Sequence, residues 1–521
     1  MRILIIEDEP EWQAELKRVA EQATFRQVEC LIAASLQAAR RLIADHAFAL
    51  IFVDLSIPLQ DGDREESDDN GMTVLQELRA DKLNREAACL VMTAHGTSRQ
   101  TREALKELNI QDFLDKSKFA KSQVVELTRR ALFAAARSHV ERIEARKFDL
   151  TFVLTNTHCV FAQLSGPERF RDVIPEQPMP FEAEEAIRRA NRIERFVTGE
   201  LRRALIDEWR TDVHDTGVAL YQSLFGNPAL GNILSAANFG PQQPRDLRLC
   251  FRGARKSLAV PFELLHDKSE YLALNYPLVR QITSGEASGR KALSFRNLLA
   301  QLEERGETLN VLLLASNVGP NIEAADREVV RLKTLLDEQL AEAGIRRAIL
   351  ALSTAEASYT RVESLLREKK WHVIHYAGHG LWNHTLPEDS ALVFRHNGGP
   401  RAMPASVLSD LMKNSAALLF FLSGCLGART ADHPERGDLY GLMDGLVQAD
   451  VPMVLGHRWS VSDGAATDLA LAFYTNLFST WSVEDALFEA RQAVIRESKY
   501  HRDDPGWASP VLVAQARYHR G

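Results

Sequence analysis

Ala416–Cys425, AALLFFLSGC, is the stretch that decides the fold of the carboxyl-terminal part of this chain. Its seven leading apolar residues are uninterrupted and end at Ser423-Gly424-Cys425. A short continuous apolar run of this kind predicts a strand buried on both faces, as in a parallel sheet. Gly424 permits a sharp bend at the carboxyl end of that strand. Cys425 is therefore expected at the sheet edge where ligands bind in open α/β folds.

A second strand with a similar ending lies upstream, at Trp371–Gly380, WHVIHYAGHG. His379 stands between two glycines in it, 46 residues before Cys425. If the two strands are parallel neighbours, their carboxyl ends bring an imidazole and a thiol together, as a cysteine nucleophile and its base require. The alternative is that Cys425 is a buried structural thiol, which is a common fate for cysteine. His375 lies inside the strand and is expected to be a hydrogen-bonded core histidine rather than the base.

The backbone around the two candidate residues offers further chemistry. Gly380 and Cys425 lie in glycine-bounded turns, so their N–H groups are candidates for an oxyanion hole. Several histidines cluster between residues 372 and 384, but no cysteine or carboxylate pattern accompanies them, which argues against zinc. The sequence therefore predicts no cofactor for this site.

The HYAGHG and LSGC segments resemble the CHAT family of caspase-like and separase-like cysteine proteases. The similarity continues through Gly456–Asp463 (GHRWSVSD) into a helical tail, Ala465–Ser498, and reaches upstream to Leu247–Ile282. The resemblance implies a caspase-like α/β domain in two halves, a pseudo-caspase half at 148–295 and an active half at 296–521. It also implies that His379 and Cys425 form a catalytic dyad that cleaves a protein substrate.

Substrate specificity is also suggested by the resemblance. Ser423 stands two residues before the nucleophile, a position that lines the first specificity pocket in caspase-like folds. In separases an acid in the region after the next strand recognises arginine, and Asp463 is the matching carboxylate here, because carboxylates pair well with the planar guanidinium group. Alternatively, Arg458 pairs with Asp463 or attracts an acidic side chain, and Asp463 could simply cap the helix that begins near Gly464.

The first 120 residues show a different pattern, in which five short apolar strands alternate with helical segments. This alternation predicts a parallel five-stranded sheet. The expected strands are Arg2–Asp8, Val28–Ala33, Ala49–Asp54, Ala88–Thr93 and Asp112–Asp115.

Charged and polar residues end several of these strands. Glu7, Asp8 and Asp54 are expected to converge on one edge, where a hard cation such as Mg²⁺ would relieve their repulsion. Asp54 would then be placed to attack phosphorus as a carboxylate nucleophile. Lys116 would neutralise the incoming phosphoryl oxygens, and Thr93 would donate a hydrogen bond to them. Taken singly, each acid could be only a solvated turn residue.

The constellation resembles the flavodoxin-like receiver domain of two-component response regulators, over residues 1–120. The resemblance implies that Asp54 is the phospho-acceptor, that Thr93, Phe113 and Lys116 are the receiver switch, and that a histidine kinase is a partner. Two departures stand out. An acidic stretch, DGDREESDDNG, follows Asp54, and Ser117 follows the lysine where the family commonly has proline.

Residues 121–147 form an amphipathic helical connector between the two parts. Such a helix either packs on the receiver domain, which is the commoner outcome, or pairs with its copy in a homodimer. Within the carboxyl-terminal part, Glu182–Trp209 is expected to be helical, and the chain is expected to end in helices after a strand at Val451–His457.

Composition narrows the class of protein. The length of 521 residues indicates about three domains. A net charge of −8, and no helix-turn-helix with a basic recognition helix, argue against nucleic-acid binding. Five cysteines without CxxC spacing favour the reducing cytoplasm, and no apolar run is long enough to span a membrane.

Together with these features, the two resemblances imply a bacterial, cytoplasmic, phosphorylation-regulated cysteine endopeptidase. The alternative is a non-catalytic output module that binds a peptide or protein in the same groove.

Overall fold

The computed structural model describes most of the chain. Outside the description lie residues 1, 24–28, 64, 82, 86, 94–107, 109, 111, 132–147, 157–158, 166–170, 179–205, 227, 229–230, 232–246, 254–257, 259, 283–294, 317, 319–322, 344, 379, 382–389, 414, 425–439, 450, 460, 462, 498–504 and 516–521. The chain divides into two compact units, the first comprising Met1–Ile143 with the short segment Leu340–Ile345 and the second comprising Glu144–Gln339 and Arg346–Gly521.

The first unit is built around a five-stranded sheet in which every pairing is parallel, in the order β2-β1-β3-β6-β7. The predicted parallel sheet is therefore confirmed, with strand ends shifted by at most two residues. Its apolar strands are buried between two hydrophobic clusters, one on each face. The strands are β1 (Arg2–Ile6), β2 (Glu29–Ala33), β3 (Leu50–Asp54), β6 (Ala88–Thr93) and β7 (Asp112–Asp115).

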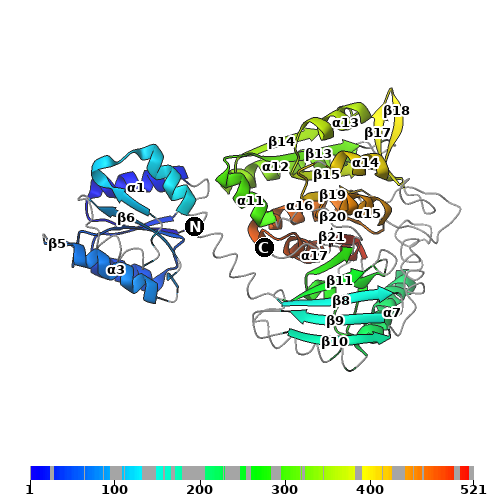
Figure 1. Ribbon diagram of the computed structural model, residues 1–521, viewed down its shortest axis with the longest axis horizontal. Helices are drawn as coiled ribbons and strands as arrows, with labels where there is room; N and C mark the ends of the chain where they lie inside the picture. The colour runs from blue at the N-terminus through cyan, green and yellow to red at the C-terminus, as the bar shows by residue number, and fades with distance from the viewer. Residues whose placement is uncertain are drawn as a thin grey trace. The chain divides into compact units, whose positions relative to one another are not determined.

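Helices α1, α2 and α3 pack beside this sheet, as do the helical residues 121–131, and each of the three labelled helices begins where the sequence supplies a suitable first turn (Figure 1). α1 (Pro10–Ala23) starts with proline, whose fixed φ suits that position, and buries Leu16, Val19 and Ala20. α2 (Leu36–Asp45) is capped by Ser35, whose hydroxyl accepts from the N–H of Ala38 at 3.2 Å. α3 (Asp68–Ala80) is capped by Ser67.

The acidic stretch after Asp54 forms a small hairpin. β4 (Ile57–Pro58) pairs antiparallel with β5 (Glu66–Ser67), and α3 follows directly. The hairpin leaves Asp61, Asp63 and Glu65 exposed to solvent, so the charges that distinguish this loop lie on the surface of the first unit.

The second unit contains one eleven-stranded sheet, in the order β10-β9-β8-β11-β12-β21-β20-β19-β15-β13-β14 (Figure 1). Strands expected in the pseudo-caspase half and strands expected in the active half thus belong to one continuous sheet. The strands are β8 (Phe148–Asn156), β9 (Cys159–Ser165), β10 (Arg171–Pro178), β11 (Leu247–Gly253), β12 (Leu278–Ile282), β13 (Leu309–Ser316), β14 (Arg347–Leu352), β15 (Val373–Gly378), β19 (Leu419–Ser423), β20 (Met453–His457) and β21 (Pro510–Gln515).

The prediction that the chain ends in helices is wrong. After the two long helices the chain returns as β21, which pairs antiparallel with β20 and parallel with β12. This strand is the one that joins the two halves of the sheet. The antiparallel meander β8-β9-β10 was not predicted from the sequence. The expected helix Glu182–Trp209 lies largely outside the described residues, and α7 (Ile206–Phe225) covers its last positions.

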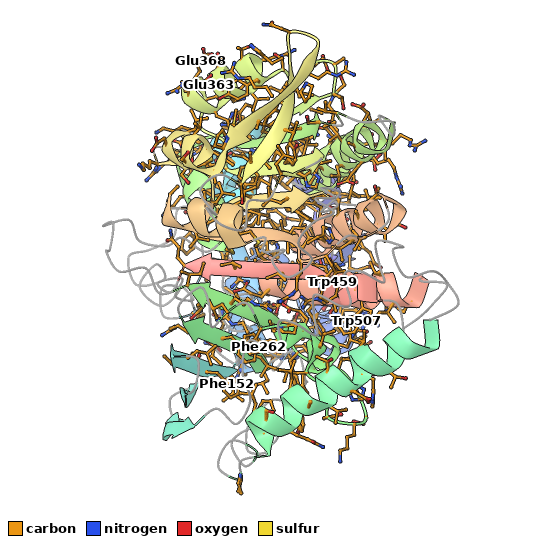
Figure 2. The ribbon with its side chains drawn as sticks, turned by 90° about the vertical axis from the view of Figure 1, so that its right-hand side faces the viewer. Phe152, Phe262, Glu363, Glu368, Trp459 and Trp507 are labelled. Carbon is orange, nitrogen blue, oxygen red and sulfur yellow. The ribbon has the colours of Figure 1, made fainter. Side chains whose placement is uncertain are left out.

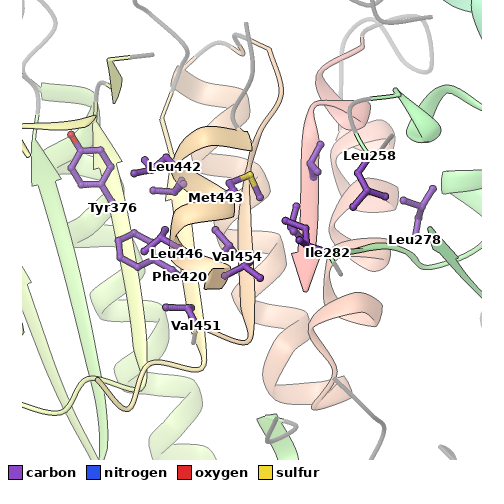
Figure 3. Close-up of a cluster of buried hydrophobic side chains, with 14 of the residues drawn as sticks. Leu258, Leu278, Ile282, Tyr376, Phe420, Leu442, Met443, Leu446, Val451 and Val454 are labelled. Carbon is purple, nitrogen blue, oxygen red and sulfur yellow. The ribbon is translucent and has the colours of Figure 1, made fainter. Parts of the chain in front are cut away.

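The two faces of the second sheet are covered by different helices. Phe420 and Val454 point into an apolar core with residues of α13 (Tyr359–Glu368), α14 (Ala405–Met412) and α15 (Tyr440–Gln448); Figure 3 shows part of this core. Phe421 of β19 points the other way, against Phe473 and Tyr474 of α16. The other described helices are α10 (Leu272–Asn275), α11 (Phe295–Glu304), α12 (Glu323–Glu342), α16 (Asp463–Thr480) and α17 (Val483–Glu497), with a 3₁₀ turn η4 (Phe262–Leu264).

Aromatic side chains mark the part of the core nearest β8. Phe251 is stacked between Phe152 and Phe262, with ring centroids 5.2 and 3.8 Å away. Phe152, Phe262, Trp459 and Trp507 lie in the lower half of Figure 2, while Glu363 and Glu368 of α13 lie at its top. None of the described helices is long and apolar enough to cross a membrane.

A three-stranded antiparallel sheet completes the second unit. β16 (Gly380–Leu381) pairs with β17 (Ala391–His396), which pairs with β18 (Gly399–Pro404). The hairpin expected near Ala391–Arg395 is therefore present. Gly380 begins a short strand, however, and not the turn that its neighbouring glycines suggested.

Candidate functional site

Three carboxylates meet at the carboxyl edge of the first sheet, as the sequence predicts. Glu7 and Asp8 follow β1, Asp54 ends β3, and one oxygen of each lies within 4.8 Å of the other two. Glu7 is fully buried and Asp54 is 5% exposed. A set of oxygen ligands on neighbouring loops suits Mg²⁺, which binds through a few carboxylates and keeps several waters.

Lys116 reaches into this cluster from the residue after β7. Its Nζ donates to Asp54 Oδ2 at 2.6 Å and to Glu7 Oε1 at 3.1 Å, and it lies 3.6 Å from Glu9 Oε1. The lysine is almost buried, so its ammonium group neutralises the acids where water is scarce. The structure thus brings together Glu7, Asp54 and Lys116 around one point.

The burial of this cluster changes its acid–base chemistry. Burial, followed by the charge of Asp54, raises the pKa of Glu7 to about 7. Burial also raises the pKa of Asp54, although Lys116 opposes that change. For Lys116 burial acts downward, but the hydrogen bonds to Asp54 and Glu7 prevail and its pKa is raised. The carboxylates of this buried cluster repel one another, and the single ammonium group of Lys116 does not balance them all. The cluster therefore favours the entry of a further cation.

The absence of proline after Lys116 is compensated by local contacts. Lys116–Lys118 forms a 3₁₀ turn, and Asp115 Oδ1 accepts from Ser117 N at 2.9 Å and from Ser117 Oγ at 2.6 Å. The Lys116 Nζ also lies 5.3 Å from the centre of the Trp12 ring, a cation–π distance. Phe119 packs edge-on against Trp12. Trp12 was not among the residues singled out from the sequence.

The two remaining switch candidates lie on neighbouring strands. Thr93 is the last residue of β6 and pairs with Asp115 of β7; its side chain lies outside the description. Phe113 is paired with Val91 and packs partly buried against the apolar cluster on one face of the sheet. Both are thus close in register to the edge that carries Lys116.

In the second unit the predicted neighbouring strands are confirmed. β15 and β19 are parallel and adjacent, with Tyr376 opposite Leu422 and Ala377 opposite Ser423. His379 and Cys425 themselves lie outside the described residues. The residues directly before them, Gly378 and Gly424, are described, and continuing the register by one position pairs these two glycines.

The two glycines are packed backbone to backbone. A Cβ atom on Gly424 would run into the carbonyl oxygen of Gly378, closer than side-chain carbons come to oxygen in real structures. A Cβ atom on Gly378 would in turn run into the carbonyl oxygen of Ser316. Glycine is therefore required at both positions by space.

The other predicted residues of this edge are partly placed. Ser423 is 3% exposed, and its hydroxyl has no hydrogen-bond partner in the described part of the chain. Asp463 is the first residue of α16, as the capping alternative expects, and its side chain lies outside the description. Arg458 follows β20 and is buried. Burial acts to raise the pKa of Glu263, but the nearby Arg280, with smaller effects of Arg491 and Arg458, lowers it.

His375, Glu328 and Thr467 form a buried polar cluster beneath the carboxyl edge of the second sheet. His375 Nε2 is hydrogen-bonded to Glu328 Oε1 of α12 at 2.9 Å, and Glu328 Oε2 accepts from Thr467 Oγ1 of α16 at 3.0 Å. Both His375 and Glu328 are buried. The expectation that His375 is a hydrogen-bonded core histidine is confirmed.

His457 is the least satisfied member of this layer. It is 1% exposed, and within the described residues neither ring nitrogen has a hydrogen-bond partner. Burial lowers the pKa of His457 to about 4. The folded protein therefore holds this imidazole uncharged well into the acidic range.

Acid is expected to destabilise the second unit through His457. The pKa in the unfolded chain is about 6.5, so the stabilisation is complete above that pH and is lost as the pH falls towards 4. The difference amounts to about 3 kcal/mol. Urea unfolding of the wild type and a His457→Phe variant at pH 7 and pH 4.5 measures it, since the variant should lose less stability in acid. Equal acid losses in the two proteins would contradict a buried neutral histidine.

Several residues of the second edge could not be found from the sequence. Glu328 and Thr467 lie on helices far from His375 in the sequence, and neither gives a local signal of its contact with this group. Tyr376, by contrast, stands inside the quoted HYAGHG segment, and its hydroxyl in a strand buried on both faces signals a need for a hydrogen-bond partner. It finds one in Val393 of β17.

Comparison with known proteins adds the family. A family model described as the response regulator receiver domain matches residues 3–129, and one described as the CHAT domain matches residues 214–515. No curated protein matches the chain.

Solved structures similar to the chain are receiver domains. The non-phosphorylated HemR receiver domain from Leptospira biflexa is 26% identical, with 25% of this chain and 93% of that one covered and a TM-score of 0.21. Response regulator TrrA from Thermotoga maritima, solved with Mg²⁺ and BeF, is 21% identical, with 25% and 97% covered and a TM-score of 0.20. The receiver domain of a sensor histidine kinase from Pseudomonas aeruginosa PAO1, solved with a magnesium ion, is 21% identical, with 25% and 96% covered and a TM-score of 0.21.

The CHAT match spans more than half of the 521 residues, and the five-stranded parallel sheet agrees with the receiver match. The chain therefore belongs to the CHAT domain family and carries a response-regulator receiver domain at its amino-terminal end.

Proposed function

We propose that this protein is a cysteine endopeptidase of caspase or separase type whose activity is gated by phosphorylation of its receiver domain. The observation that carries the proposal is the packing of Gly378 against Gly424 at the ends of two paired parallel strands. Each glycine is bonded to one member of the proposed dyad, and successive Cα atoms are about 3.8 Å apart. The strand ends that lead into His379 and Cys425 therefore lie side by side, which supports the pairing of these two residues.

The proposed chemistry follows from this placement. His379 withdraws the thiol proton of Cys425, and the thiolate attacks the scissile carbonyl carbon. Backbone N–H groups of Gly380 and Cys425 donate hydrogen bonds to the developing oxyanion and so form the oxyanion hole. Residues 148–295 and 296–521 are the supporting and active halves in this proposal, and residues 121–147 connect them to the receiver domain at 1–120.

Labelling with a thiol-reactive peptide tests the catalytic assignment directly. A peptide bearing an acyloxymethyl ketone should modify Cys425 of the wild type but leave the His379→Ala variant unlabelled, because labelling needs an activated thiolate. Mass spectrometry identifies the modified residue. Equal labelling of both proteins would instead favour a peptide-binding module, in which the groove holds the peptide without acid–base chemistry.

In the receiver domain the acidic cluster is proposed to hold Mg²⁺ through Glu7, Asp8 and Asp54. Asp54 takes a phosphoryl group from a histidine kinase, and Lys116 pairs with the phosphoryl oxygens. Lys116 already donates to Asp54 at 2.6 Å, so it is held at the atom where the phosphoryl group would attach. The metal would supply charge neutralisation for the transfer.

Beryllofluoride with Mg²⁺ is expected to change the rate of peptide cleavage. Phosphorylation should draw Thr93 and Phe113 inward and alter how the receiver packs on the connector, and such a ligand shifts an equilibrium only by its differential affinity for the two states. The expected coupling is about 1–3 kcal/mol, or up to roughly a hundredfold in rate. Turnover is measured with and without the ligand, and an Asp54→Asn variant is the control. If beryllofluoride is shown to bind and the two cleavage rates are identical, the receiver domain does not regulate the protease.

Cleavage is expected after a basic residue, with arginine preferred to lysine. Asp463 is the first residue of α16, the helix that packs on the Phe421 face of the sheet. Ser423 is two residues after Phe421 in β19, so both side chains point to this face. Arg458 is buried, and Asp463 is therefore the charge that we assign to the pocket. A peptide library in which the residue directly before the cleavage site is varied over all amino acids measures the preference. Selection of aspartate or of uncharged residues there would contradict this assignment.

A further inference from the structure

We infer that Ser316 and Tyr376 are positioning residues for His379, because their hydroxyl groups hold the strand that pairs with Gly380, the residue after it in the sequence. The inference rests on the proposed cysteine-protease function, and neither residue belongs to the dyad or to the oxyanion hole. Ser316 ends β13 and Tyr376 lies in β15, so the two come from adjacent parallel strands.

Both hydroxyl groups converge on the backbone of Val393 in β17. Ser316 Oγ donates to the Val393 carbonyl at 2.5 Å, and Tyr376 Oη donates to the same oxygen at 2.9 Å. The Val393 N–H in turn lies 3.3 Å from Tyr376 Oη and donates to it. All three residues are buried, so these polar groups would be costly to leave without partners.

Val393 stands next to the residue of β17 that pairs with Gly380. β16 and β17 are antiparallel, with Gly380 paired to Leu392 and Leu381 paired to Ala391. The hydroxyl pair thus fixes β17 one residue away from its pairing with Gly380, the residue that follows the proposed base in the sequence.

The same two residues also confine the chain on the other side of His379. A Cβ atom on Gly378 would meet the Ser316 carbonyl oxygen and would lie 2.8 Å from Tyr376 Oη. Gly378 and Gly380 flank His379 directly, and one is packed against Ser316 and Tyr376 while the other pairs with the strand that they hold. The two residues bonded to His379 are therefore both held by this one group of contacts.

Tyr376 contacts Val393 through its hydroxyl, whereas its ring has a separate role. Its ring packs with the apolar core and lies edge-on to Phe394, 5.4 Å between centroids, which a phenylalanine would do equally well. Figure 3 shows the ring beside the core, with its oxygen at the end turned away from Phe420. Burial keeps the pKa of Tyr376 well above its ordinary value, so the phenol remains a neutral donor at every working pH.

Precise placement of a general base matters because catalysis falls steeply with small displacements, by about a hundredfold per ångström. Tyr376→Phe keeps the ring and removes only the hydroxyl, and Ser316→Ala removes the second donor. Ser409→Ala is the matched control, since Ser409 Oγ also donates to a backbone carbonyl, that of Gly445 at 2.8 Å, but joins α14 to α15 instead.

The experiment measures the pH dependence of Cys425 alkylation by iodoacetamide, with the Cys425→Ala protein subtracted for the other cysteines. In the wild type the thiol should react at a pH below that of an ordinary cysteine. In Tyr376→Phe and in the double variant the profile should move upward by about one pH unit, because the imidazole no longer stabilises the thiolate. Peptide cleavage should show kcat about 10- to 100-fold lower with KM nearly unchanged.

The control and the alternatives are distinguishable. Ser409→Ala should lower the melting temperature but leave both the alkylation profile and kcat at wild-type values. Unchanged profiles in Tyr376→Phe and the double variant, beside a depressed wild-type profile, would overturn the positioning role and leave the protease assignment standing. An ordinary cysteine profile in the wild type would overturn both.

Discussion

The Cys425→Ala protein is expected to lose peptide cleavage by roughly 10⁴-fold or more while it unfolds at the wild-type temperature. The thiolate is the nucleophile in the proposed mechanism, and alanine has no atom that can take its place. The position follows Gly424 at a sheet edge and not inside the strand, so removal of one sulfur atom should cost the fold little.

Cys250→Ala is the matched control for this experiment. Cys250 lies in the middle of β11 and is 1% exposed, so its removal should leave a small cavity and lower stability by about 1–2 kcal/mol. Cleavage should nevertheless continue at close to the wild-type rate. The same change from cysteine to alanine would then abolish cleavage but spare stability at position 425, and lower stability but spare cleavage at position 250. Retained cleavage in Cys425→Ala would end the nucleophile assignment.

The receiver sheet could be predicted strand by strand because its signal is local. Each strand is a short apolar run, four of the five end at or just before a residue with a proposed chemical role, and β6 and β7 begin and end where the sequence places them. The meeting of Glu7, Asp54 and Lys116 also follows from strand order alone, because parallel neighbours end at the same edge. What the sequence could not supply was the support of Lys116 by Trp12, a contact across the fold.

The second sheet was harder because its assembly depends on long-range pairing. β21 is a five-residue apolar run followed by a polar residue near the end of the chain, and nothing local shows that it lies between β20 and β12. The meander β8-β9-β10 is similarly weak in sequence. Gly380 was misplaced because glycine on both sides of His379 suggests a turn, whereas pairing with Leu392 makes it a strand.

Gly424→Ala is expected to reduce cleavage by about a hundredfold and to destabilise the second unit by about 1–3 kcal/mol. The added methyl group would meet the carbonyl oxygen of Gly378. Both are backbone positions, so no side-chain rotation relieves the contact and the ends of β15 and β19 must move apart. That movement separates the two residues that follow, His379 and Cys425.

The displacement cannot be absorbed on the far side, because Gly378 is itself pressed against the carbonyl oxygen of Ser316. The strain is therefore shared by three strand ends, β13, β15 and β19, which pair in that order. The loss should appear mainly in kcat, since the peptide groove is altered less than the distance between imidazole and thiol. Kinetics on a peptide substrate and urea unfolding measure the two effects separately.

Gly464→Ala is the control for glycine replacement near the same edge. Gly464 is the second residue of α16, and a Cβ atom there would have no heavy atom within 4 Å. Alanine should be tolerated and should add about 0.4–1 kcal/mol of stability, because it restricts the unfolded chain. If Gly424→Ala cleaved peptide as fast as Gly464→Ala, the two glycines would not set the separation of the dyad. The proposed site would then have to be built from other residues of the edge.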